Sequence, residues 1–370
     1  MHFRSGRSEC RKFWVRFVRL VKLFNMINLT KPSDSEGSND TQSFENKGIL
    51  FFSPAFNVFI ITALVAVIVV AILGNILVCI AMCWNPNLRK ATTSLFLLSL
   101  AVSDLLTASL VIPFDVNIIL KNGLWFHGED ACKLWTTAYL LTVPTSNLTL
   151  MFLSIDRYLT LRRPLSQFRA DQTMTRKTIF VYMVLLWIYL LVWALLPLTG
   201  WELWRLFPLS VNNDICFFNI STLYSSLVSA LHFILPALVM CIIYVMIYRL
   251  IWKHTRTIHP MDAPVPTQSP QARLALQRNI RAAKRIAVIV SVFLLCWVPY
   301  SVLSITSQFC FDCFLKIPQE VLYFTLMMGY SNSALNPILY SFNNRNFIDS
   351  YKRLYQGVRK TLTRRLGRMK

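Results

Sequence analysis

Seven long apolar segments constrain this chain more than any other feature of its sequence. Each has the roughly 20 residues that an α-helix needs to cross the hydrocarbon core of a bilayer. A segment in lipid must satisfy its backbone hydrogen bonds internally, so we expect helices rather than loops. The spans are about 55–83, 93–119, 130–159, 176–198, 221–250, 281–306 and 319–342. The predicted fold is an all-α membrane protein, a bundle of seven transmembrane helices.

The composition agrees with this fold class. The chain has 370 residues, of which 55% are hydrophobic and only 15% are charged, a balance that soluble domains rarely show. A net charge of +21 would also suit a nucleic-acid-binding protein, but the positive charges lie in short runs between the apolar segments. This arrangement is typical of basic cytoplasmic loops. We therefore expect the lipid bilayer as a partner and no nucleic acid.

The loop charges also predict an orientation. Basic residues gather after the first, third and fifth spans and after residue 343, whereas the other loops carry sparse, mixed charge. By the positive-inside rule, the N-terminus is extracellular and the C-terminus is cytoplasmic. We accordingly divide the chain into an N-terminal tail (1–50), a seven-transmembrane domain (51–342) and an amphipathic helix with a basic cytoplasmic tail (343–370).

The N-terminal tail has two parts. Residues 1–25 interleave basic and apolar side chains, so they are either a cationic amphipathic helix or an upstream extension that the mature protein lacks. Their positive charge conflicts with an extracellular position and favours the extension. Glycosylation sequons begin at Asn28, Asn39 and Asn219, all on the predicted outer side. A further match at Asn147 lies within a span, where we expect no glycan.

Four cysteines lie in or beside the predicted outer loops. Cys132 begins the third span and Cys216 lies in the second outer loop, and the oxidising exterior favours a disulfide between them. Such a bond would hold the loop over the mouth of the bundle. Cys310 and Cys313 either close a small disulfide ring or form half of a metal site. No second closely spaced pair accompanies them, which favours the disulfide.

Polar side chains recur at one depth of the bundle. A lone carboxylate there would be read as a core acid that its neighbours satisfy, but hydroxyl and amide groups accompany it on the facing helices. An oxygen-rich set with one carboxylate suits a small hard cation such as sodium. The set comprises Asn75, Asp104, Ser146, Asn332, Ser333 and Asn336. We expect no cofactor beyond this ion.

The third span ends in an acid, a base and a phenol, Asp156, Arg157 and Tyr158. Ionisable residues at a membrane border are costly unless they are paired or hydrated, so they indicate function. On helix six, Trp297 lies two residues before Pro299. Proline removes a backbone donor and kinks a helix, which places a large ring beside a candidate hinge.

Taken in order, these motifs resemble the rhodopsin-like (class A) G protein-coupled receptors over about residues 50–356. Each motif is weak alone, but all of them, each on its own span, are specific. They are Gly74-Asn75, Leu100-Ala-Val-Ser-Asp104, Asp156-Arg157-Tyr158, Trp187, Pro197, Pro236, Tyr244, Phe293-Leu-Leu-Cys-Trp-Val-Pro299 and Asn336-Pro-Ile-Leu-Tyr340. The resemblance implies a plasma-membrane receptor that passes an extracellular ligand signal to a heterotrimeric G protein, with arrestin as a further partner.

The resemblance also implies roles for particular residues. Asp156 would pair with Arg157 at rest, and Arg157 would engage the G protein when helix six swings outward. The full switch set is Asp156, Arg157, Tyr158, Tyr244, Asn336, Pro337 and Tyr340. Phe293, Trp297 and Pro299 would relay ligand contact to the lower half of helix six. Asp104, Ser146, Asn332 and Ser333 would hold sodium in the inactive state.

The nearest branch is the biogenic amine receptors, which the run from Gly329 to Pro337 resembles in its histamine-type and adrenergic-type members. Those receptors bind the ligand ammonium with an aspartate in helix three, where this chain has Tyr139. Asp115 and Glu320 are the nearest acids, and each is either a substitute counter-charge or a rim carboxylate in water. The ligand pocket is expected among Asp115, Tyr139, Val143, Ser229, His232, Trp297, Tyr300, Tyr323 and Tyr330. His232 is alternatively a core hydrogen-bonding residue.

Other functions fit less well. A peptide remains an alternative to a small, amine-like ligand, because the fold does not fix the ligand. A transporter would be expected to show paired repeats or interrupted helices, and none is recognisable in the sequence. An enzyme would need a nucleophile with a base, or two facing acids, at mid-membrane, so no catalytic residue is expected. Helix six also has Asn279 where the family usually places a glutamate that ties it to Arg157, which predicts a weak resting lock.

Overall fold

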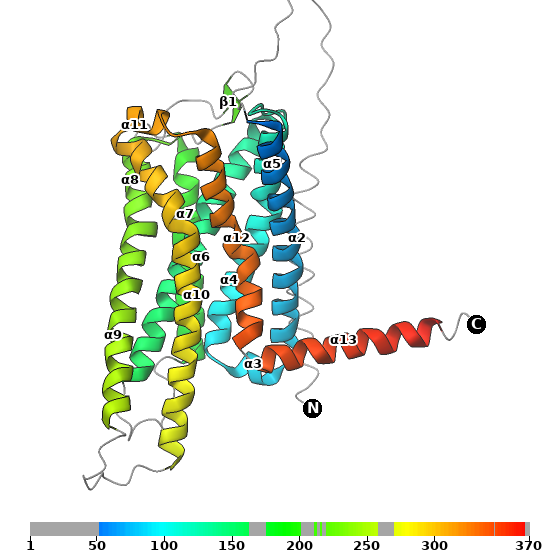
Figure 1. The fold of residues 1–370 in the computed structure, drawn as a ribbon, viewed down its shortest axis with the longest axis vertical. Coiled ribbons are helices and arrows are strands. Elements are labelled where there is room, and N and C mark those ends of the chain that lie inside the picture. The colour runs from blue at the N-terminus through cyan, green and yellow to red at the C-terminus, as the bar shows by residue number, and fades with distance from the viewer. Residues whose placement is uncertain are drawn as a thin grey trace, which may run out of the picture.

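The computed structural model describes residues 52–162, 175–200, 211–212, 215–216, 220–257, 270–343 and 345–366. Its long helices stand side by side as one bundle, and a last helix runs outward from one end (Figure 1). The expectations for residues 1–25, for the N-terminal tail and for the sequons at Asn28, Asn39 and Asn219 lie outside the described residues. The predicted domain limits stay predictions.

The long helices follow the predicted spans. They are α2 (Pro54–Trp84), α4 (Thr93–Leu110) with α5 (Ile112–Leu120), α6 (Gly128–Arg162), α7 (Arg176–Leu195), α8 (Thr222–Ser229) with α9 (Leu235–Thr257), α10 (Pro270–Phe309) and α12 (Gln319–Asn343). Shorter elements connect or extend them. These are α3 (Pro86–Lys90), the 3-10 turn η3 (Leu196–Thr199), the π-helical η4 (Ala230–Ile234), α11 (Phe311–Leu315) and α13 (Arg345–Leu366).

Within the described residues, six helical spans are long and apolar enough to cross a membrane, and α12 is not among them. The reason is the polar content of α12, since Asn332, Ser333 and Asn336 interrupt its apolar sequence. These three residues are buried, and α12 packs against α2, α4 and α10. Its polar face therefore points into the bundle. The prediction of a seven-helix all-α membrane fold is confirmed.

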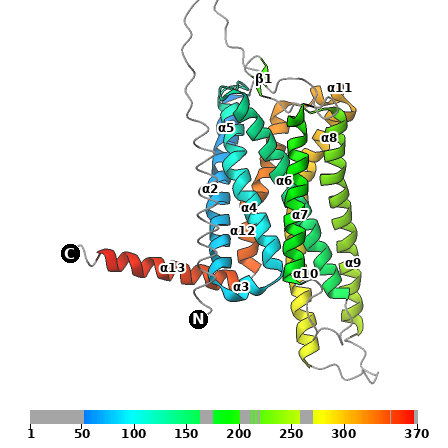
Figure 2. The same ribbon diagram turned by 180° about the vertical axis from the view of Figure 1, so that it is seen from behind.

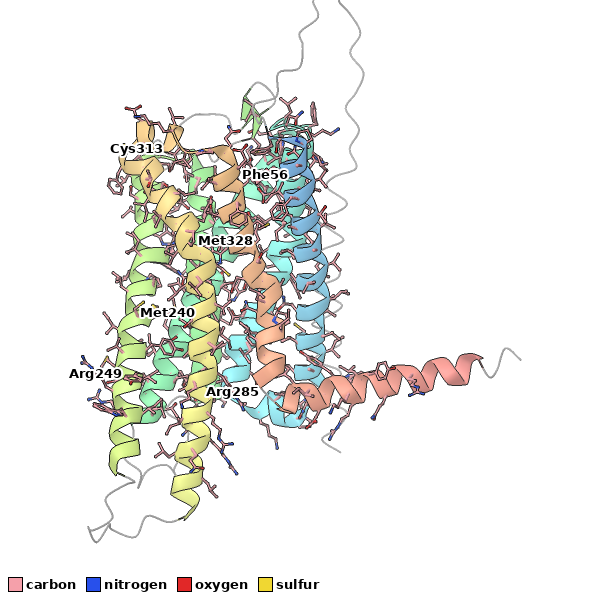
Figure 3. The ribbon with its side chains drawn as sticks, in the orientation of Figure 1. Phe56, Met240, Arg249, Arg285, Cys313 and Met328 are labelled. Carbon is pink, nitrogen blue, oxygen red and sulfur yellow. A yellow bond between two sulfur atoms is a disulfide. The ribbon has the colours of Figure 1, made fainter. Side chains whose placement is uncertain are left out.

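The two ends of the bundle differ. A two-stranded sheet, β1 (Val211–Asn212) and β2 (Ile215–Cys216), pairs antiparallel with Val211 opposite Cys216. It lies at the same end as α11, and α3 and the start of α13 lie at the other end (Figures 1 and 2). We call these the disulfide end and the tail end. Cys313 lies at the disulfide end, whereas Arg249 and Arg285 lie toward the tail end (Figure 3).

Two helices at the tail end extend past the predicted limits. Helix α10 begins at Pro270, well before the predicted start at 281. Its first turns contain Ala, Leu, Gln and Arg, which are strong helix formers, so the helix continues after the apolar pattern stops. Helix α13 reaches Leu366, so the helix also takes up most of the segment that was predicted as an amphipathic helix followed by a basic tail (343–370). Hydropathy marks where a chain leaves the membrane, and it does not mark where a helix ends.

Candidate functional site

Two disulfide bonds lie at the disulfide end. The structure contains both predicted disulfides, Cys132–Cys216 with a Cα–Cα distance of 5.8 Å and Cys310–Cys313 with one of 5.2 Å. The first joins the start of α6 to β2, so it fixes the loop strand at the mouth of the bundle. The second makes the metal-site alternative for Cys310 and Cys313 wrong.

Below this mouth, Asp115 is buried. Asp115 is only 4% exposed, and the Tyr330 hydroxyl on α12 donates a hydrogen bond to Asp115 Oδ2 at 2.8 Å. The alternative of a rim carboxylate in water is therefore wrong for Asp115. Glu320, at the start of α12, is by contrast half-buried. The structure thus separates the two acids that the sequence left equivalent.

Four tyrosines from three helices surround the buried acid. Asp115 acts electrostatically on Tyr139, Tyr300, Tyr323 and Tyr330. Tyr139 on α6 and Tyr300 on α10 hydrogen-bond to each other. A carboxylate among aromatic rings suits a cation, because the ring faces add cation–π attraction to the charge pair.

A cavity of about 280 Å³ lies beside this acid, between α6, α8 and α10. The predicted pocket residues Tyr139, Ser229 and Tyr300 line it. The other lining residues are Leu140, Pro144, Ile220, Ser225, Val228, Phe233, Ser301, Ser304, Ile305 and Ser307. None of the lining side chains is an acid or a base. The serines of α10 carried no signal in the sequence, because serine is ordinary in membrane helices and nothing marked that face.

The remaining predicted pocket residues do not line the cavity. Trp297 lies beneath, with its ring centroid 6.1 Å from Tyr300, 6.2 Å from Tyr330 and 6.3 Å from Phe233. Val143 is buried in the core. Trp297 therefore lies among rings from η4, α10 and α12.

His232 corrects the expected pocket. Its ring packs edge-on against Trp193 and Tyr189 of α7, with centroids 5.3 and 5.5 Å away. Its Nε2 lies 3.0 Å from the Tyr189 hydroxyl, and the residue is 1% exposed. The alternative of a core hydrogen-bonding residue is therefore right, and His232 faces α7 instead of the cavity.

Two buried asparagines repair hydrogen bonds that prolines remove. A proline has no N–H, so the carbonyl four residues earlier in its helix loses its usual donor. Pro236 deprives the His232 carbonyl in this way, and the Asn147 amide Nδ2 donates to that oxygen instead. Asn75 does the same for Ser333, four residues before Pro337, at 3.0 Å. The unusual Asn147 thus has a structural explanation.

The predicted cation set meets around Asp104. Ser333 Oγ donates to Asp104 Oδ1 at 2.8 Å, and Asn336 Nδ2 donates to Asp104 Oδ2 at 2.9 Å. Ser146 lies on the facing helix, where its hydroxyl hydrogen-bonds to Ser103 at 2.8 Å. Asn332 Oδ1 is buried, with no hydrogen-bond partner among the described residues. A buried amide oxygen without a partner is, like a carboxylate or hydroxyl oxygen, the kind of ligand that a hard cation takes.

The switch residues lie toward the tail end. The Arg157 guanidinium forms an ion pair with Asp156, and its Nε lies 3.0 Å from Asp156 Oδ2. Tyr244 on α9 meets Ser154 of α6, with their oxygens 3.4 Å apart. Helix α10 contains no Asp or Glu, so it has no acidic side chain to offer Arg157. In the structure Arg157 therefore pairs with Asp156, within α6.

The end of α12 completes this region. Tyr340 is buried and its ring centroid lies 6.4 Å from that of Phe347 on α13. A Cβ at Gly74 would lie 2.8 Å from two side-chain carbons of Pro337, so only glycine lets α2 approach α12 here. Of the three predicted switch residues at this end of α12, Pro337 therefore faces α2, Asn336 contacts α4 and Tyr340 packs against α13.

The comparisons with known proteins agree with this geometry. A model of the family described as 7 transmembrane receptor (rhodopsin family) matches residues 74–340. The chain belongs to this family of G protein-coupled receptors. Its members transmit ligand signals to G proteins and are not enzymes, and nothing supports the transporter alternative.

Among its relatives are receptors for biogenic amines. The Octopamine receptor beta-2R of Chilo suppressalis is 29% identical, over 78% of this chain and 77% of the relative. The human 5-hydroxytryptamine receptor 4 is 32% identical, over 80% and 79%. The dog Histamine H2 receptor is 31% identical, over 82% and 81%. The predicted amine-like branch of the class A receptors is confirmed.

Proposed function

We propose that this receptor responds to a small cationic amine and binds its ammonium group with Asp115. The observation that supports this most is the hydrogen bond between the buried Asp115 and Tyr330. A buried carboxylate is costly unless it is paired, and a ligand cation would provide the missing partner. The role that helix three lost with Tyr139 would then belong to α5.

The site favours a small ligand. The cavity of about 280 Å³ approaches the size of ordinary small-molecule pockets, which begin near 300 Å³. It lies directly beside the tyrosines that surround Asp115. The charged end of a compact amine would reach the acid, and the rest of the molecule would lie in the cavity. A peptide would be too large for this cavity.

The test is a panel of biogenic amines on cells that express the full chain, read by cAMP and calcium. Asp115→Asn keeps the shape but removes the charge. Truncating one partner of a buried charge pair costs about 2–5 kcal/mol, so the potency of the active amine should fall about 30-fold or more. Glu320→Gln is the control and should change little. Equal potency on wild type and Asp115→Asn would contradict the proposal.

We also propose that the Asp104 set holds a sodium ion that favours the inactive state. An ion that binds one state better shifts the population toward it. Agonist affinity should therefore fall when sodium replaces potassium at constant ionic strength, and Asp104→Asn should abolish the difference. A sodium effect that persists in Asp104→Asn would place the ion elsewhere.

The orientation and the inner partners complete the proposal. The N-terminus would be extracellular and the C-terminus cytoplasmic in the plasma membrane, which the charge asymmetry of the loops supports. The G protein, and arrestin after it, would bind the tail end beside Arg157. Helix α13 would lie on the inner leaflet, because Phe347 is buried while Lys352 and Arg353 are exposed and suit anionic lipid headgroups.

A further inference from the structure

We propose that the disulfide Cys310–Cys313 is a thiol-exchange site, at which a dithiol outside the cell reduces the bond and thereby loosens the outer end of α10 beside the cavity. The inference rests on the orientation in the proposed function, which places the disulfide end outside, and it needs no assumption about the ligand. The bond joins the end of α10 to α11, where Cys313 is labelled in Figure 3.

The two disulfides of this end differ in their exposure to solvent. Cys132 and Cys216 are only 0% and 9% exposed, whereas Cys313 is exposed and Cys310 is half-buried. A thiolate reduces only a disulfide whose sulfur it reaches, and exposed disulfides are in general the labile ones. A dithiol should therefore reduce Cys310–Cys313 while Cys132–Cys216 stays intact.

The exchange balances in two steps. A thiolate of the dithiol attacks the sulfur of Cys313, the more exposed residue, and forms a mixed disulfide, while Cys310 leaves as a thiolate and takes up a proton. The second thiol of the reagent, after losing its proton, attacks the mixed disulfide and displaces Cys313, which is protonated in turn. Two cysteine thiols are formed, and the dithiol loses two electrons and two protons and becomes a cyclic disulfide.

The bond holds a turn that would be weak without it. Cys310 directly follows α10 and is the N-cap residue of α11, and the Phe314 N–H donates to the Cys310 carbonyl at 3.0 Å. Helix α11 has only five residues, fewer than a helix needs to be stable alone. The two cysteines are only three residues apart, and a disulfide that closes a short loop adds less to global stability than one that closes a long loop. Reduction should therefore free α11 without unfolding the bundle.

Gln308 connects this turn to the cavity. It lies two residues before Cys310, and its side-chain amide bridges from α10 to α8. Gln308 Nε2 donates to Ser229 Oγ at 2.9 Å, and Ser226 Oγ donates to Gln308 Oε1 at 3.2 Å. We call these two hydrogen bonds the α8–α10 latch. Because residues of both helices line the cavity, the latch joins two of its walls, and freeing the turn beside Gln308 should weaken it.

Differential alkylation of the purified full chain tests the exchange. Free thiols are blocked with N-ethylmaleimide, the receptor is treated with increasing dithiothreitol, and the new thiols are labelled with isotopic N-ethylmaleimide and located by mass spectrometry. We expect label at Cys310 and Cys313 at concentrations that leave Cys132 and Cys216 unlabelled. Equal labelling of the two pairs, earlier labelling of Cys132 and Cys216, or no label at Cys310 and Cys313 would overturn the inference.

Intact cells test the orientation separately. After dithiothreitol treatment, a membrane-impermeant maleimide should label Cys310 and Cys313 from outside. Label on broken but not on intact cells would refute the proposed orientation, and with it the extracellular reductant, even where the purified chain shows selective reduction.

A reporter thiol in the cavity tests the consequence for α10. Ser225 lines the cavity and takes no part in the latch, so Ser225→Cys reports access through its rate of reaction with a water-soluble methanethiosulfonate. With Cys310→Ser and Cys313→Ser this rate should rise about two- to tenfold, the equivalent of one neutral hydrogen bond. Gln308→Ala removes the latch directly and should give a similar rise, and combining all three changes should add nothing. Lys316→Ala, an exposed change beside the same turn, is the control.

The outcomes separate the bond from the latch and both from the ligand. Unchanged reporter rates in the cysteine variants, beside faster ones in Gln308→Ala, would show that the bond does not hold the latch and would overturn the inference. Where the cysteine variants do not fold, Ser225→Cys treated with dithiothreitol and then freed of it replaces them, with the same expected rise. No amine is used, so a failed Asp115→Asn test would leave this inference standing.

Discussion

At the scale of single residues, the structure explains substitutions that the sequence could only register as departures. Tyr139 occupies the position in helix three where amine receptors have an aspartate. The structure has a buried acid on α5, Asp115, which accepts a hydrogen bond from Tyr330. Asn147 is a buried amide within a span, and it serves the carbonyl that Pro236 leaves without a donor. Neither pairing was predictable from one sequence, because each joins residues far apart in the chain. The sequence indicated only that an acid and an amide lie within membrane spans, where polar side chains need partners.

The role of Asn147 predicts a non-additive effect on stability. Asn147→Leu leaves the His232 carbonyl without its donor, which should cost about 1–3 kcal/mol and lower the thermal inactivation temperature of the solubilised receptor. Pro236→Ala restores a backbone N–H to that carbonyl, so Asn147→Leu should cost less in that background. A double-mutant cycle measures the difference. Equal costs in the two backgrounds would show that Asn147 stabilises the fold in another way.

At the scale of helices, hydropathy located all seven spans but not their real ends or irregularities. The break between α4 and α5 comes just before Pro113, and η4 just before Pro236. Proline is a known kink site in a helix, yet whether a proline yields a break, a π-helical turn or a continuous helix depends on its neighbours. Pro144 shows this, because α6 continues through it. His232 was misplaced for the same reason: the π-helical turn sets which way it points.

The acid-free α10 leads to a prediction about resting activity. In the structure Arg157 pairs with Asp156 on its own helix, and no ion pair joins the described side chains of α6 to those of α10. Asn279→Glu would add an acid on α10, and a cross-helix pair should hold the inactive state more firmly. Basal cAMP or calcium signalling should fall at equal surface expression, and Asn279→Gln is the neutral control. Unchanged or raised basal signalling in Asn279→Glu would argue against a weak resting lock.

At the scale of the whole molecule, the bundle forms a compartment at each of two depths. One is the tyrosine-lined acid beside the cavity near the disulfide end, and the other is the Asp104 set at mid-bundle. The sequence predicted the fold, and it also predicted that Ser333 and Asn336 meet Asp104, because the motifs lie on separate helices at matching depths. It predicted the ligand compartment only in part, because the lining depends on helix rotation, which sequence motifs do not determine.

The central claim is that the ligand's counter-charge has moved from helix three to α5. The most direct test returns the acid to helix three with Tyr139→Asp. The potency of an active amine is measured on wild type, on Asp115→Asn and on the double variant Asp115→Asn with Tyr139→Asp. The account predicts that the single variant loses about 30-fold or more and that the double variant recovers most of the loss. Full potency in Asp115→Asn alone would contradict the claim.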